Sequence, residues 1–122
     1  MALNLRNLTV SVSERPGDVT LAKIEGEVDT ISSEDIKTMI EHFQCTGRKK
    51  LIFDLEEVTY LNSKAIGVLS QALRRMRHGG GDLKLCNLSP VVRKIFEITS
   101  LFEVFAVYES VEEAVEAYAR EG

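Results

Sequence analysis

The chain has 122 residues, 44% of them apolar and 28% charged, a balance typical of a single compact domain over residues 1–122 and not of a disordered or collagen-like protein. Its formal net charge of -4 disfavours nucleic acid and anionic lipid as partners. No stretch approaches the roughly 20 apolar residues of a membrane span, and no basic segment followed by an apolar block opens the chain. We therefore expect a cytoplasmic protein without membrane insertion.

The first two predicted elements form an antiparallel hairpin. Residues 8–12 alternate between apolar and polar side chains, which indicates a strand with one covered face. Segment 14–18 contains a proline and a glycine and reverses the chain. Residues 19–28 then return as a second strand. The apolar phase of that strand changes between Leu21 and Ala22, which predicts either a bulge or burial on both faces.

A helix is predicted after the hairpin. Ser32 or Ser33 supplies its N-cap, and Asp35 lies three residues after Ser32, in the position of a capping box. One apolar face is defined by Ile36, Met39, Ile40 and Phe43. Gly47 and the three cations of residues 48–50 end the helix, where its dipole favours positive charge.

The central stretch of the chain joins a strand to a second helix. A mostly apolar run that begins at Leu51 has the length of a buried strand, and a polar loop is predicted between it and Asn62. That loop brings Asn62 and Ser63 to the start of a helix expected over residues 64–78. The apolar side of this helix is formed by Ile66, Leu69, Leu73 and Met76. Basic residues gather at its carboxyl end, again as the dipole favours.

The remaining elements continue the alternation of strand and helix. Residues 82–86 form the next strand, and Ser89–Pro90 then supplies an N-cap and a first-turn proline for a short helix. The last strand is predicted over residues 104–107. Ser110 and Glu113 open the closing helix as a capping box. The apolar face of that helix consists of Val111, Ala114, Val115 and Tyr118.

This order of elements predicts an α/β fold. Parallel neighbouring strands need a connection of helical length, and such crossovers are right-handed. We expect a mixed, mostly parallel sheet of about five strands, with the N-terminal hairpin as its antiparallel part and about four helices covering it.

Candidate catalytic groups are few. Neither histidine and neither cysteine has partners at the spacing of a metal site, a redox pair or a nucleophile and its base. Asp54, Glu56 and Glu57 lie at the end of the central strand, where ligands often gather in parallel sheets, but a solvated loop explains them equally well. We therefore expect no metal, no cofactor and no enzymatic activity.

Ser63 stands out by its position between a buried strand and a helix. Asn62 or Ser63 must cap that helix, and a capping hydroxyl is worth about 1 kcal/mol without any further role. Alternatively, phosphorylation would give Ser63 roughly -1.5 to -2 charges and three acceptor oxygens. The N-terminus of a helix tolerates such an anion, whereas a partner docked over it would not. The residues alone leave both explanations open.

Three segments together resemble the STAS domain of the bacterial anti-sigma factor antagonist type. They are Gly26–Asp29, Phe53–Leu55 and Leu61–Leu69, and the resemblance extends over about residues 3–118. The family usually has Asp before the serine and small residues after it, whereas this chain has Asn62 before Ser63 and Lys64 after it.

The resemblance implies a partner-switching protein. The unphosphorylated antagonist binds an anti-sigma factor that is also a serine kinase of the histidine-kinase-like ATPase fold, and this frees a sigma factor. Phosphorylation at the position of Ser63 ends the binding, and a serine phosphatase restores it. The implied partner-binding residues are Asp29, Thr30, Asn62, Ser63, Lys64, Ala65, Ile66 and Gly67. A weak homodimer remains open. Lys64 and Ala65 motivate the alternative of an unphosphorylated STAS scaffold, or a subunit of a transporter or stress-signalling complex.

Overall fold

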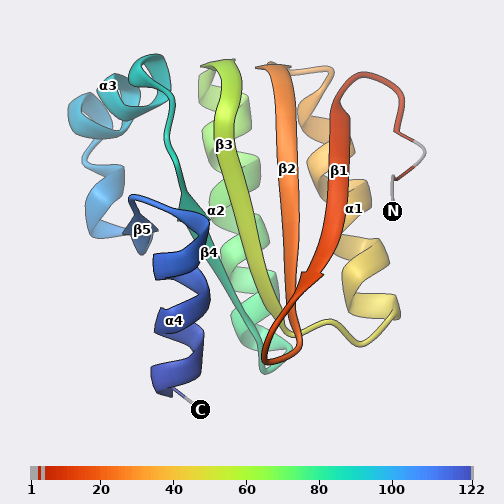
Figure 1. Cartoon of the computed structure of the whole chain (residues 1–122). Coiled ribbons are helices and arrows are strands. Elements are labelled where there is room, and N and C mark those ends of the chain that lie inside the picture. The colour runs from red at the N-terminus through yellow and green to blue at the C-terminus, as the bar shows by residue number, and fades with distance from the viewer. Residues whose placement is uncertain (1–2, 4, 122) are drawn as a thin grey trace.

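The computed structural model describes residue 3 and residues 5–121, and it forms a five-stranded sheet flanked by helices (Figure 1). In chain order the elements are β1 (Thr9–Arg15), β2 (Val19–Val28), α1 (Ser33–Cys45), β3 (Lys50–Leu61), α2 (Ser63–His78), β4 (Asp82–Cys86), α3 (Pro90–Thr99), the 3-10 helix η1 (Leu101–Glu103), β5 (Val107–Tyr108) and α4 (Val111–Glu121). The strand order is β1-β2-β3-β4-β5, with β1 antiparallel to β2 and the other pairs parallel. The predicted fold class is confirmed.

Helices cover both faces of the sheet. In Figure 1 α1 and α2 lie behind it, whereas α4 lies in front of its β4–β5 side. Ala22 and Ile24 of β2 point into the larger core with α1 and α2, and Val19 and Leu21 join the smaller core under α4. The phase change in β2 therefore reflects burial on both faces. Register shifts against β3 occur later, between residues 23 and 25 and between residues 26 and 27.

The central strand is longer than the sequence suggests. The polar loop predicted before Asn62 is wrong, because β3 continues through Leu61 and pairs with β2 along this stretch. Val58 and Leu61 are only 0% and 2% exposed, so two apolar anchors among polar residues hold the extension against the core. As a result, a rigid strand and not a loop leads directly to Asn62.

The predicted capping box at the start of α1 is also wrong. Ser32 occupies the N-cap position, but its hydroxyl accepts from the Asp29 backbone N–H at 2.9 Å and donates to the Glu27 carbonyl at 2.7 Å. The Asp35 carboxylate accepts instead from the backbone N–H groups of Asn7 and Leu8, both at 2.8 Å. Asp35 thereby ties the segment before β1 to α1.

The last predicted strand, residues 104–107, is likewise wrong. Ser100 ends α3 in a left-handed conformation with φ 59°, and η1 follows, so β5 contains only Val107–Tyr108. Phe105 is buried through a turn, in which its N–H donates to the Leu101 carbonyl, and its ring lies 5.9 Å from that of Phe96. An apolar run can thus reach the core without forming a strand.

The two remaining caps follow the sequence prediction more closely. The Ser89 hydroxyl accepts from the Val92 N–H and also donates to the Val58 carbonyl at 2.6 Å, which fixes α3 beside β3. Ser110 accepts from the N–H of Glu113, whose carboxylate accepts from the backbone N–H of Glu109.

Within the described residues, no helix is long and apolar enough to cross a membrane.

Candidate functional site

The candidate site lies where β2 and β3 reach their carboxyl ends. The Asn62 backbone N–H donates to the Val28 carbonyl at 3.1 Å, which prolongs the strand pairing to the last residue before α2. The Asn62 side-chain amide donates to the Thr30 hydroxyl at 3.2 Å. These two bonds hold the β2–α1 loop beside the start of α2, so two segments that are more than thirty residues apart form one surface.

Asn62 is the N-cap of α2. Its backbone is extended, with φ -93° and ψ 179°, and its side-chain oxygen accepts from the Ala65 N–H at 2.9 Å. Ser63 is therefore the first helical residue and not the cap. The Ser63 side chain is exposed, and its hydroxyl forms no hydrogen bond with the described part of the chain. The structure thereby removes the capping explanation of this serine.

Asp29 shapes the neighbouring loop. Its carboxylate accepts from the backbone N–H groups of Ile31 at 3.0 Å and Ser32 at 2.8 Å, and from the Ser32 hydroxyl at 3.0 Å. The hydrogen bonds from Ser32, backbone first, hold the pKa of Asp29 below its ordinary value. An ionised Asp29 thus folds the loop that carries Thr30, its predicted companion in partner binding.

The other predicted residues differ in accessibility. Lys64 is exposed and forms no ion pair within the described chain. Gly67 is also exposed, and an added Cβ there would meet nothing within 4 Å. Ile66 is half-buried against the main core, and Ala65 is fully buried. Ala65 and Ile66 therefore support the surface from beneath, while Ser63, Lys64 and Gly67 form its outer part.

Two exposed apolar residues, which the sequence analysis did not single out, adjoin this surface. Ile31 is 70% exposed in the loop beside Thr30, and Tyr60 is 47% exposed near the end of β3. Other large apolar residues of the chain, such as Ile98 at 73%, are exposed as well, so it is the place of Ile31 and Tyr60 beside Thr30 and Asn62 that makes them available to a partner. The only signal in the sequence is an isoleucine within the polar run of residues 29–33.

The carboxylates of β3 do not form a metal or catalytic centre. Asp54 is buried and accepts from the Glu56 N–H at 3.0 Å and from the Asn87 side-chain amide at 3.3 Å. Glu56 instead lies 3.8 Å from Lys23. Among the described residues, no group of three or more histidine, cysteine or acidic side chains is arranged to hold a metal ion.

The mixed five-stranded sheet carries an exposed serine at the first position of the helix that follows β3. The model of the STAS domain family matches residues 10–114. The anti-sigma-B factor antagonist of Listeria monocytogenes serovar 1/2a is 30% identical over 101 residues, which cover 83% of this chain and 89% of that protein. The antagonist of the same name from Bacillus subtilis is 29% identical over 83% of this chain and 91% of that protein.

Solved structures agree on the fold. A putative anti-sigma factor antagonist from Thermotoga maritima superposes with a TM-score of 0.80 at 21% identity, covering 88% of this chain and 92% of that one. Unphosphorylated SpoIIAA, an anti-sigma factor antagonist, gives a TM-score of 0.74 at 22% identity over 90% of this chain and 96% of its own.

The chain belongs to the STAS domain family, among the bacterial anti-sigma factor antagonists. Members of this group are regulatory binding proteins, which confirms the prediction that the protein is not an enzyme.

Proposed function

We propose that the unphosphorylated protein binds an anti-sigma factor and thereby releases a sigma factor, and that phosphorylation of Ser63 ends this binding. The anti-sigma factor is a serine kinase of the histidine-kinase-like ATPase fold, and a serine phosphatase regenerates the binding form. The exchange takes place in the cytoplasm. The observation that carries the proposal is the cap: because Asn62 supplies the N-cap hydrogen bond to the Ala65 N–H, the Ser63 hydroxyl is left exposed and unbonded within the described chain.

The position of Ser63 suits a kinase substrate. In the transfer, the Ser63 oxygen forms a bond to the γ-phosphorus of ATP, ADP leaves, and the hydroxyl proton passes to a base of the kinase. No hydrogen bond to the described chain has to break before the serine reacts. The product also fits this position, because unpaired N–H groups and the dipole at a helix N-terminus stabilise a phosphate.

The position also explains how phosphorylation would act on binding. The proposed partner surface comprises Asp29, Thr30, Asn62, Ser63, Lys64, Ala65, Ile66 and Gly67, with the outer part formed by the exposed members. A phosphate at Ser63 places a hydrated dianion in the middle of that surface. The fold remains intact because the phosphate contacts no buried group, so binding is lost without unfolding.

The test uses a histidine-kinase-like anti-sigma factor encoded in the source genome. The purified kinase, ATP and this protein are incubated together, and any phosphate is located by mass spectrometry. We expect a single phosphate on Ser63 and none on a Ser63→Ala control. Modification at another residue, or none with every such kinase, contradicts the proposed switch. Copurification with a membrane ATPase or a large assembly would then favour the scaffold or subunit role.

A further inference from the structure

Charge is distributed unevenly between α2 and the rest of the chain. The sequence of α2 contains four of the 15 lysines and arginines and none of the 19 acidic residues. The chain as a whole carries a net charge of -4, so the remainder is strongly acidic around one basic helix. Salt bridges do not compensate this charge: of the α2 cations only Arg77 has a carboxylate partner among the described residues, Asp82 at 3.1 Å.

The helix dipole explains only part of this pattern. Arg75, Arg77 and His78 lie in the last turn, where the negative end of the dipole stabilises cations. Lys64 lies in the first turn, which contains no acidic residue, and there the dipole opposes a positive charge. Folding therefore gains nothing from a lysine at this position, which points to a role in binding.

Six of the eight exposed residues of α2 form one continuous track, and the other two, Ser63 and Arg77, lie beside it. The six are Lys64, Gly67, Gln71, Arg74, Arg75 and His78. Their spacings of three and four residues place them on the same side of the helix. At 1.5 Å per residue the track is about 20 Å long. It begins beside Ser63, has a notch without a side chain at Gly67, and ends in three cationic or titratable side chains.

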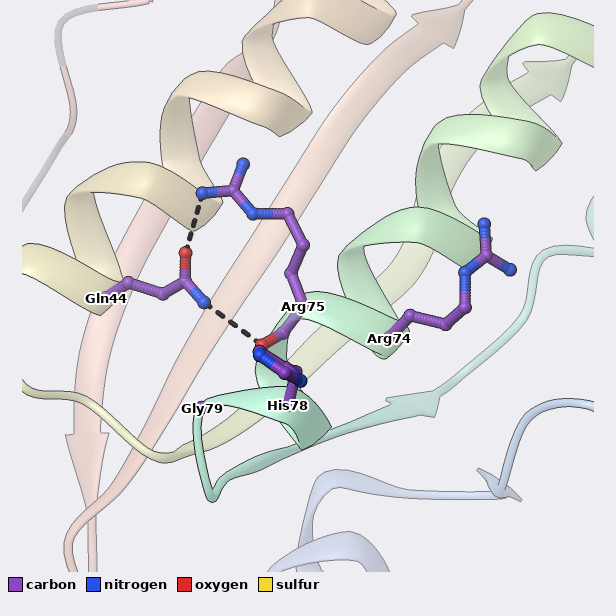
Figure 2. Close-up of a pocket in the computed structure, with 5 residues that line it drawn as sticks. All are labelled: Gln44, Arg74, Arg75, His78 and Gly79. Carbon is purple, nitrogen blue, oxygen red and sulfur yellow. Dashed lines mark hydrogen bonds between the residues drawn. The ribbon is translucent and has the colours of Figure 1, made fainter.

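Two hollows adjoin the carboxyl half of the track. One, of about 230 Å³, lies between α1 and α2 and is lined by Lys37, Ile40, Val68, Gln71, Ala72 and Arg75. The floor of this hollow is apolar, and its volume is large enough for one side chain of a partner. A shallower one, of about 550 Å³, is lined by Gln44, Arg74, Arg75, His78 and Gly79 (Figure 2).

Gln44 of α1 holds Arg75 at the boundary between these hollows. The Arg75 guanidinium donates to the Gln44 side-chain oxygen at 2.8 Å, and the Gln44 amide donates to the Arg75 carbonyl at 3.1 Å. Figure 2 shows these two side chains reaching toward each other, while Arg74 projects away from α1. The guanidinium is thus oriented by a neutral partner, so its full charge is available to an anion.

We propose that this track docks an acidic segment of the anti-sigma factor, with carboxylates facing Lys64 at one end and Arg74 and Arg75 at the other. An apolar side chain of the same segment occupies the hollow between α1 and α2. The inference rests on the proposed function and adds the chemistry of the partner. An acidic protein segment fits better than nucleic acid, because the rest of the chain is acidic and would repel a long polyanion.

The track also explains why a phosphate at Ser63 would be effective. The phosphate neutralises the adjacent Lys64 and repels the carboxylate that this lysine would otherwise attract. Arg74 and Arg75 lie about 15 Å further along the helix. At that distance in solvent, physiological salt screens most of the effect of the phosphate. Phosphorylation thereby ends the binding through the anchor at Lys64, without acting directly on Arg74 and Arg75.

The test measures the affinity of the purified protein for its anti-sigma factor by isothermal titration calorimetry. Arg74→Glu combined with Arg75→Glu should raise Kd roughly tenfold or more, and the corresponding double Gln variant should raise it less. Lys94→Glu is the matched control: Lys94 is an exposed cation on α3, without an ion pair in the described chain, and its reversal should change Kd by less than about twofold. Circular dichroism confirms that each variant is folded.

The outcomes separate the two proposals. If the wild-type protein binds and the double Glu variant binds equally well, the proposed docking of an acidic segment is wrong, whereas the proposed function stands. If the wild-type protein binds no histidine-kinase-like anti-sigma factor, both proposals fail. Raising NaCl from about 50 to about 300 mM should weaken wild-type binding more than that of the double Gln variant, and an equal response would also contradict the track.

Discussion

The two ends of α2 are both positively charged, but different interactions hold them in place. At the amino end a single side chain, Asn62, satisfies the helix and joins it to the neighbouring loop, which leaves Ser63 free. At the carboxyl end the turn of residues 79–81 lies against Lys49, the residue before β3, and Arg75 is hydrogen-bonded to Gln44 of α1. At the first end the reactive hydroxyl is unbonded within the described chain, whereas at the second end hydrogen bonds orient Arg75 and backbone contacts confine Gly81.

At the two ends of α2, the charges that stabilise the helix and the charges that suit a binding surface are not the same. Cations at the carboxyl end of a helix are favourable, so their presence there does not by itself indicate a function. Lys64 at the amino end is unfavourable for the helix, and Ser63 contributes no hydrogen bond to the described fold. Residues that break a local rule without compensation are the best indication of a binding surface.

The largest effect is expected from Gly81→Ala at the packed end. A Cβ at this position would lie 2.3 Å from the backbone carbonyl oxygen of Lys49, so β3 or the turn must shift. We expect a loss of about 2–3 kcal/mol in the free energy of unfolding, measured by urea denaturation. Gly80→Ala is the control, because it meets nothing within 4 Å and only its φ of 85° costs energy, about 1–2 kcal/mol. Equal losses would show that the contact with Lys49 is unimportant.

Ser63→Asp probes the open end. It should raise the Kd for the anti-sigma factor roughly tenfold or more, equivalent to about 1.4 kcal/mol, because it adds charge to the middle of the surface. Thermal stability should stay the same or rise by a few tenths of a kcal/mol, since an anion near a helix N-terminus is favourable. Weaker binding together with a large fall in Tm would mean that Ser63 is structural after all.

Asn62→Ala removes the side-chain hydrogen bond by which Asn62, and not Ser63, caps α2. The variant loses the hydrogen bond from the Ala65 N–H and the one to Thr30, so the free energy of unfolding should fall by about 1 kcal/mol. Asn62→Asp retains an acceptor for the helix and should keep most of the stability. Chemical denaturation of both variants provides the measurement. An unchanged Asn62→Ala variant would indicate that Ser63 can take over as the cap.

Gly67→Ala should separate stability from binding. The position is helical and open to solvent, so the added methyl group should raise the free energy of unfolding by roughly 0.5–1 kcal/mol. If a partner lies against the track at this notch, the same methyl group should weaken its binding severalfold. A variant that gains stability without any change in Kd would place the partner elsewhere on α2.

The sequence predicted the place of Ser63 at the junction of strand and helix better than it predicted the hydrogen bonds there. The strand, the serine and the following helix were identifiable from an apolar run and a helical period, and the family resemblance then pointed to Ser63. Periodicity could not decide between Asn62 and Ser63 as the cap, because both residue types accept a hydrogen bond there equally well. The extended backbone of Asn62, set by its pairing with Val28, made that choice.

The sequence by itself determined the order of elements, the mixed sheet and most of the buried face of α1, α2 and α4, since these follow from the spacing of apolar side chains. Tertiary structure decided what depends on distant partners. The length of β3 depends on pairing with β2, and Asp35 bonds to backbone groups 27 and 28 residues away. The exposure of Ser63 and the uncompensated charge of α2 also depend on distant parts of the fold. A one-dimensional pattern reports which side of an element is covered, but the fold alone decides which polar groups meet.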